Sequence, residues 1–227
     1  MALEKSKMKT RPEPRISVNK LAEYLEANPT RRKQIVSDAK HPKEFIVTRY
    51  KDARTVIKNY IMNIDDEDYV LDSITELRGI ETETDFQEQD RNLSIDCLES
   101  VLETDLTELE DYEIEPFERE NKCLNIAGVD VSVNPDLVVR NGEEVGAIKL
   151  HLAKASLSPE GQKIVATLLY TYTKEFIVEE GETADPWLCI SFDVFNESLE
   201  HCPTGVKLRL RRIEDACQEI ALWWDKL

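Results

Sequence analysis

Residues 129–152 read VDVSVNPDLVVRNGEEVGAIKLHL, and this stretch holds the strongest structural signals in the chain. Its first part alternates Val129, Val131 and Val133 with polar residues, and this period of two predicts a strand with one buried face. Pro135 punctuates that strand, because proline cannot donate a backbone hydrogen bond. Two further segments, 136–140 and 145–152, flank a turn signal and predict a second and a third strand.

The turn signal between these two strands is Asn141-Gly142, a pair typical of two-residue β-hairpins. With these residues at the centre of the turn, Asp136 pairs with Ala147. Side chains alternate along a strand, so Asp136, Ala147 and Lys149 are expected to project from one face of the sheet. Asp136 and Lys149 then become diagonal neighbours within side-chain reach.

The remaining apolar patterns predict helices around this hairpin. Ser158-Pro159 is a helix-start signal, with serine as N-cap and proline in the first turn. Helices are expected after Ser17 and at about 31–39, 43–62, 98–109, 158–178 and 213–227, and further strands at 186–195 and 197–208. The order predicts an α/β (α+β) fold in which helices flank a central mixed sheet, preceded by an N-terminal helical region.

Charge divides the 227-residue chain into three regimes beneath its net charge of −17. Residues 1–60 are basic, with 15 Lys/Arg and 7 Asp/Glu. Residues 61–120 are strongly acidic, with 3 Lys/Arg and 22 Asp/Glu, and residues 121–227 are mildly acidic, with 11 Lys/Arg and 17 Asp/Glu. We expect a disordered basic arm at 1–14, a helical region at 15–120 and an α/β core at 121–227. The acidic middle is either a solvated helical surface or a surface that docks on the basic head (residues 1–60), masks it, or holds a basic partner.

Composition also points to a compartment. The five cysteines are odd in number and scattered, without a C-x-x-C pair, which favours a reduced, cytoplasmic environment. The sequence has no run of 18 apolar residues, and its basic N-terminus lacks the apolar core of a signal peptide. We therefore expect a cytoplasmic protein without a membrane partner.

The carboxylate and the ammonium on the hairpin suit two interpretations. A carboxylate binds a divalent metal, and a lysine beside it positions water and offsets phosphate charge. The alternative is a salt bridge on a sheet face. On the residues alone, Asp136 and Lys149 fit either reading.

The sequence around this pair resembles a known family. Pro135-Asp136, followed after ten residues by Ala147-Ile148-Lys149, resembles the motif of the PD-(D/E)XK nuclease-like superfamily. The order helix, three strands, helix, strand over about 95–195 is also similar to its restriction-endonuclease-like core. The resemblance implies Asp136 as a ligand of Mg²⁺ or Mn²⁺ and Lys149 as the catalytic lysine.

The resemblance departs from the family pattern at Ala147, which stands where the second metal-binding acid belongs. Some members of the superfamily carry that acid on the helix after the third strand, which here implies Glu160. Gln162 resembles a glutamine that some families carry on this helix. Asp130 on the preceding strand is a further candidate ligand. His151 shares the face of Lys149 by strand parity, and either assists there or is packed.

Basic residues supply candidate contacts to DNA or RNA. Arg31, Arg32 and Lys33 begin a predicted helix, the end that disfavours cations, so an anionic partner or an ordinary solvated face would explain them. Lys154 is a candidate phosphate contact near the hairpin. The whole-chain charge disfavours strong non-specific DNA binding, although a local basic patch remains compatible with it.

Two functions follow from these observations. The first is a metal-dependent nuclease that hydrolyses phosphodiester bonds in DNA or RNA. The second is a catalytically inactive protein of the same fold that serves as an interaction or scaffolding module in a larger assembly. Ala147 and the acidic charge favour the second function, whereas Pro135-Asp136 with Lys149 at suitable spacing favours the first.

Overall fold

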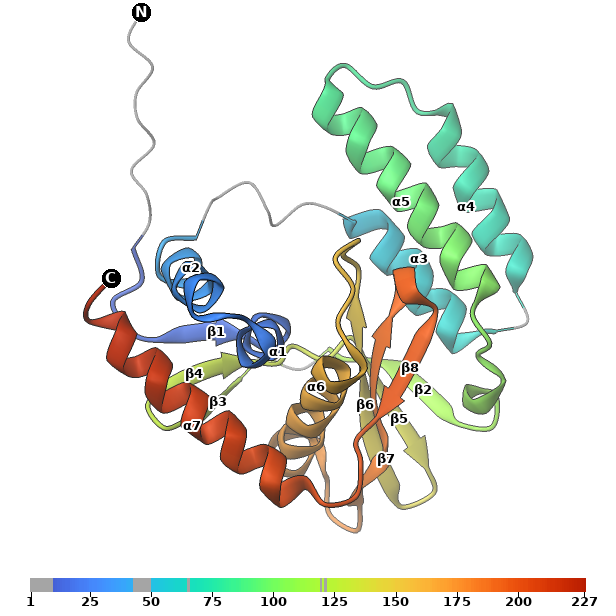
Figure 1. Cartoon of the computed structure of the whole chain (residues 1–227). Coiled ribbons are helices and arrows are strands. Elements are labelled where there is room, and N and C mark those ends of the chain that lie inside the picture. The colour runs from blue at the N-terminus through green and yellow to red at the C-terminus, as the bar shows by residue number, and fades with distance from the viewer. Residues whose placement is uncertain (1–9, 43–49, 65, 119, 121) are drawn as a thin grey trace, which may run out of the picture.

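The computed structural model describes residues 10–42, 50–64, 66–118, 120 and 122–227 (Figure 1). The helices are α1 (Val18–Glu26), α2 (Pro29–Lys40), α3 (Lys51–Met62), α4 (Glu67–Gly79), α5 (Asp85–Glu103), α6 (Pro159–Tyr172) and α7 (Val206–Trp224). The strands are β1 (Arg15–Ser17), β2 (Glu113–Pro116), β3 (Cys123–Ile126), β4 (Val129–Ser132), β5 (Leu137–Asn141), β6 (Glu144–His151), β7 (Thr183–Asp193) and β8 (Ser198–His201). Short helical turns are η2 (Thr107–Leu109), η3 (Thr173–Ile177) and η4 (Val194–Asn196).

The centre of the molecule is a five-stranded mixed sheet in the order β2-β5-β6-β7-β8, which confirms the predicted α+β class. Only β6 and β7 run parallel within it, and α6 forms the crossover between them. The β6–β7 register shifts between Val145 and Ala147. Gly146 permits this shift, because a Cβ added there would lie 2.1 Å from the carbonyl oxygen of Leu188.

The β5–β6 hairpin forms where it was predicted, but its register was predicted wrongly. Val138 is the partner of Ala147, and the two residues at the centre of the turn are Gly142 and Glu143. Gly142 has a φ of 63°, and Asn141 stays in the strand, so glycine takes the first turn position. The error is two residues, which preserves the face of every side chain and brings Asp136 directly opposite Lys149.

The segment 129–133 does not join this central sheet, which corrects the expectation of one sheet over 123–195. Instead, β4 lies in a separate three-stranded sheet, between β1 in parallel and β3 in antiparallel orientation. Asn134 adopts a left-handed conformation with φ 46°, and Pro135 follows it without a backbone N–H. This pair redirects the chain from one sheet to the other.

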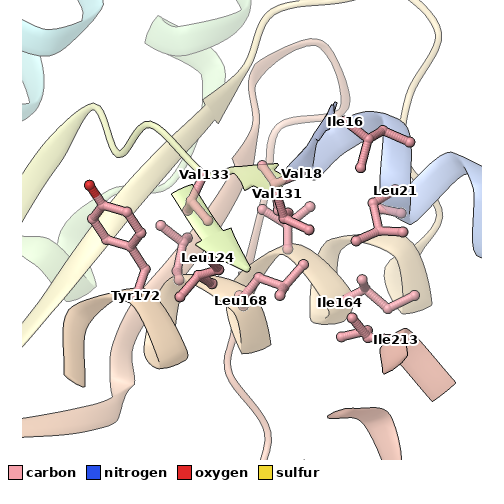
Figure 2. Close-up of a cluster of buried hydrophobic side chains, with 14 of the residues drawn as sticks. Ile16, Val18, Leu21, Leu124, Val131, Val133, Ile164, Leu168, Tyr172 and Ile213 are labelled. Carbon is pink, nitrogen blue, oxygen red and sulfur yellow. The ribbon is translucent and has the colours of Figure 1, made fainter. Parts of the chain in front are cut away.

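The central sheet buries an apolar core on each face. One core joins β5, β6 and β7 to α1, α2, α6, α7 and the three-stranded sheet, as Figures 1 and 2 show. The other core lies against α3, α4 and α5. In Figure 2, Val131 and Leu124 of the small sheet face Leu168 of α6. The N-terminal elements therefore pack directly on elements of the expected 121–227 core.

Several element boundaries differ from the sequence expectations. The second helix begins at Pro29 with Asn28 as its N-cap, two residues before the expected start at 31. The last helix begins at Val206, directly after Gly205 in a left-handed conformation, so it includes residues 206–208 of the expected 197–208 strand, and residues 198–201 of that segment form β8. Residues 1–9 of the expected 1–14 arm and the helix start at 43–49 lie outside the described residues. Among the described helices, none has both the length and the apolar composition to cross a membrane.

Candidate functional site

Asp136 lies at the start of β5, where the chain enters the central sheet. Its side chain is buried, with 7% exposure. Oδ2 accepts the backbone N–H of Leu150 at 2.9 Å, and Oδ1 accepts a hydrogen bond from the guanidinium of Arg54 on α3. Both carboxylate oxygens are therefore occupied by donors of the chain itself.

Lys149 lies opposite Asp136 on the central strand β6. Its Nζ donates to Asp136 Oδ2 at 3.1 Å and to the carbonyl oxygen of Asn134 at 2.6 Å. The side chain of Lys149 is 13% exposed. The structure thus brings together the predicted Asp136 and Lys149 as a buried ion pair, and Arg54 joins it from a helix 82 residues earlier in the chain.

Burial and neighbouring charge act in opposite directions on the two partners. Burial alone raises the pKa of Asp136, but Lys149, Arg54 and the Leu150 N–H outweigh it, so the pKa lies below its ordinary value. Burial lowers the pKa of Lys149, and the cations Arg54 and Lys58 lower it further against the opposing charge of Asp136. Asp136 is therefore the ionised centre of a cluster with more cations than anions.

A metal ion lacks the ligands it needs around Asp136. Ala147 is fully buried in the apolar core that faces α6. Glu160 pairs instead with Arg209 and Arg212 of α7, at 3.3 and 2.9 Å, and Asp130 accepts a hydrogen bond from Asn125 in the small sheet. Over the described residues, no three His, Cys, Asp or Glu side chains form a group that could hold a metal. This donor set does not fit Mg²⁺ or Mn²⁺.

Gln162 is buried on α6, with 1% exposure. Its Nε2 donates to Ser198 Oγ at 2.9 Å. Ser198 belongs to β8, the far edge of the sheet from β5, and pairs with Asp193. Gln162 therefore contacts the β7–β8 side of the sheet, whereas Asp136 and Lys149 lie on β5 and β6.

The predicted nucleic-acid contacts are engaged within the chain. Arg31 pairs with Glu23 at 2.5 Å, and Arg32 pairs with Glu219 at 3.1 Å. Lys33 lies over the ring of Trp223 at 4.6 Å, and Lys154 pairs with Asp96 at 2.7 Å. These contacts fix α2 against α1 and α7, and the 152–158 segment against α5. Each of the four cations therefore has a partner within the chain, and none requires a bound nucleic acid to explain its position.

Residues that the sequence analysis did not select also contribute to the polar interior. No sequence pattern marked Arg54 as a site residue, because the helix that contains it was predicted only from the spacing of its apolar residues. Asp193 is a lone acid at the end of an apolar strand, and that pattern could have identified it. Asn19, Ser191 and Asp193 join His151 and Gln162 as buried or partly buried polar residues on the α6 side of the sheet.

The acidic middle forms a groove that the sequence could not locate. Two adjoining hollows of about 460 and 910 Å³ lie between the end of α3, the start of α4 and residues 102–112, and share Ile64 and Glu110. We call them together the acidic groove. The acids in their walls are Asp66, Glu67, Asp68, Asp105, Glu110 and Asp111. Neither hollow has a lysine or arginine among its described lining residues.

Comparison of the chain with protein-family models and with curated protein sequences found no match.

Proposed function

We propose that this chain is a non-catalytic interaction module built on a nuclease-like α/β core. The observation that supports this proposal is the state of Asp136. Its two oxygens accept from Arg54, Lys149 and the Leu150 N–H, and a buried Ala147 stands where a second acid would be needed. A carboxylate engaged in this way stabilises the hairpin and the α3 contact rather than binding a metal.

The acidic groove is the proposed contact surface for a basic segment of a partner protein. Six acids line the groove, and within the described residues none of Glu67, Asp68, Glu110 and Asp111 forms an ion pair. Like charges at short range repel, so a bound Lys/Arg-rich segment would relieve that repulsion. Partly buried Ile64 and Leu102 in the walls offer apolar contact to such a segment.

The partner surface is tested with a variant that removes two negative charges. Glu110→Gln with Asp111→Asn avoids the first turn of α4, where acids also stabilise the helix dipole. Glu214→Gln with Asp215→Asn makes the same charge change on exposed residues of α7 and serves as the control. The probe is a fluorescent Lys/Arg-rich peptide, measured by anisotropy at two salt concentrations.

We expect the groove variant to weaken peptide binding by roughly fivefold, equivalent to about 1 kcal/mol for two exposed ion pairs, and to flatten its salt dependence. The α7 control should bind as the wild type does. Equal losses in both variants would mean that only net charge attracts the peptide, and the groove assignment would then fail.

The absence of catalysis is tested separately. Wild-type protein is incubated with single- and double-stranded DNA and with RNA in Mg²⁺ or Mn²⁺, with a chelator control, and metal affinity is measured by calorimetry. We expect neither cleavage nor binding of either metal at the site. Ala147→Glu adds the missing acid to the Asp136 face and should raise metal affinity if the core retains the nuclease geometry. Chelator-sensitive cleavage that Asp136→Asn and Lys149→Ala abolish would overturn the non-catalytic proposal.

A metal-dependent nuclease remains the second candidate, and one observation favours it. Asp136 and Lys149 lie face to face at 3.1 Å. The central-sheet strands β2, β5 and β6 lie between α5 and α6 as the family resemblance implies, but β3 and β4 are inserted between β2 and β5 and belong to the other sheet. In that function Lys149 would supply positive charge beside the attacked phosphate. The cleavage experiment above distinguishes the two candidates.

A further inference from the structure

Asp193 is the centre of a second buried polar cluster that the proposed function does not use. Five buried side-chain oxygens on α1, α6 and β7 lack a hydrogen-bond partner in the described part of the chain: Asn19 Oδ1, Tyr24 Oη, Gln162 Oε1, Ser191 Oγ and Asp193 Oδ1. Leaving such an atom unpaired costs about 1–3 kcal/mol. Asp193 is the one ionisable carboxyl among them.

The sheet register defines the surroundings of Asp193. His151 on β6 and Ser198 on β8 are the cross-strand partners of Asp193 on either side. The amide nitrogen of Asn19 lies 3.1 Å from His151 Nδ1, and that of Gln162 lies 2.9 Å from Ser198 Oγ. The two amide groups therefore contact the side chains of the residues that flank Asp193 in the sheet.

The two oxygens of Asp193 are in different environments. Oδ2 accepts the N–H of Leu157 at 2.9 Å, and Oδ1 has no hydrogen-bond partner among the described residues. His151 Nε2 lies 2.9 Å from the carbonyl oxygen of Ala155 and must carry the hydrogen, so its Nδ1 accepts from Asn19. The unpartnered amide oxygens of Asn19 and Gln162 can only accept, so a carboxyl proton on Asp193 would offer one of them a donor.

The charges around Asp193 are consistent with a retained proton. Asp193 is fully buried. Burial raises its pKa above the ordinary value, and the opposing Leu157 N–H, His151 and Asn196 N–H do not cancel the effect. The titratable groups that face it are His151 from β6 and Cys97 from α5, whereas α1, α6 and β8 present only Asn19, Gln162 and Ser198. No ion pair of Asp193 occurs among the described residues, in contrast to Asp136.

We propose that Asp193 keeps its carboxyl proton in the folded protein, donates it to an amide oxygen of Gln162 or Asn19, and acts as a pH-sensitive latch on residues 152–158. This segment connects β6 to α6, and the Leu157 N–H ties it to Asp193. When Asp193 ionises, its charge is buried without a counter-ion, and displacement of the 152–158 segment is the shortest way to expose it to water. Rising pH therefore opens this segment.

The test uses Asp193→Asn, which keeps the shape, keeps an acceptor for Leu157 and replaces the carboxyl proton with an amide N–H donor. Unfolding equilibria of the wild type and the variant are measured in urea from pH 5 to pH 9. A raised folded-state pKa means that the folded protein binds more protons than the unfolded chain, so stability falls as pH rises. The wild-type unfolding constant should rise relative to that of the variant, by up to about tenfold per pH unit while Asp193 titrates.

Glu214→Gln, which removes one negative charge from an exposed position on α7, is the control and should show the same pH dependence as the wild type. Parallel wild-type and Asp193→Asn profiles would overturn the latch. If Asp193→Asn fails to fold, the infrared C=O band of a protonated carboxylic acid in the wild type decides the question. The band should persist at pH values where an exposed aspartate is already ionised, and hydrogen exchange at Leu157 should accelerate as it disappears; loss of the band at the ordinary aspartate pKa would refute the proposal.

Discussion

Asp136→Asn should destabilise the protein through the charge that it leaves behind on Lys149. The asparagine can still accept the Leu150 N–H, but Lys149 keeps only the Asn134 carbonyl and remains near Arg54 and Lys58. Removing one partner of a buried ion pair typically costs about 3–5 kcal/mol. Lys149 can lose its proton to relieve part of this penalty, so we expect the lower end, about 3 kcal/mol at neutral pH.

The mechanism is tested with a double-mutant cycle that adds Lys149→Met and Asp136→Asn/Lys149→Met. The double variant has no orphaned charge in the pair, so urea unfolding should show that it recovers at least about 1.5 kcal/mol of the loss in Asp136→Asn. The penalty in Asp136→Asn should also shrink as pH rises and Lys149 loses its proton. A coupling energy below about 0.5 kcal/mol would show that the pair adds nothing to stability and would refute this reasoning.

Two further substitutions test the fold around the site. Gly146→Ala should lower the free energy of unfolding in urea by about 2–3 kcal/mol, because the new Cβ would lie 2.1 Å from the Leu188 carbonyl oxygen and β7 would have to shift. Gly79→Ala is the control, because a Cβ there would have no atom within 4 Å, and it should change the free energy of unfolding by less than about 0.5 kcal/mol. Thr84→Ala should cost about 1 kcal/mol, since Thr84 and Gln87 form a capping box at the start of α5; a loss no larger than that of Thr75→Ala would contradict this assignment.

The sequence predicted the parts of this fold that neighbouring residues control. Alternation over 129–152 gave the strands, and Ser158-Pro159 gave the start of α6, where Ser158 accepts the Gly161 N–H at 3.0 Å. Strand parity placed Asp136 and Lys149 on one face, and this survived a register error of two residues because the side-chain period is also two.

Sequence alone could not predict how distant segments pair. The parallel contact of β1 with β4 joins residues more than a hundred positions apart, and no local pattern in the three residues of β1 announces it. For the same reason the strand at 129–132 was assigned to the wrong sheet. The location of the hairpin turn also depended on which residue adopts a positive φ. Gly142 adopts it, whereas Asn141 stays in the strand, because glycine has no Cβ to disfavour this conformation.

The same division applies to the candidate site. The sequence by itself determined that a carboxylate and a lysine face each other in a central hairpin and that alanine replaces the second acid. Only the tertiary structure decided that Arg54 completes the ion cluster, that Glu160 and Asp130 pair elsewhere, and that Asp193 is fully buried. Strand period and turn chemistry act over a few residues, whereas the partner of a buried charge is chosen by packing between segments far apart in the chain, where desolvation makes each unpaired group costly.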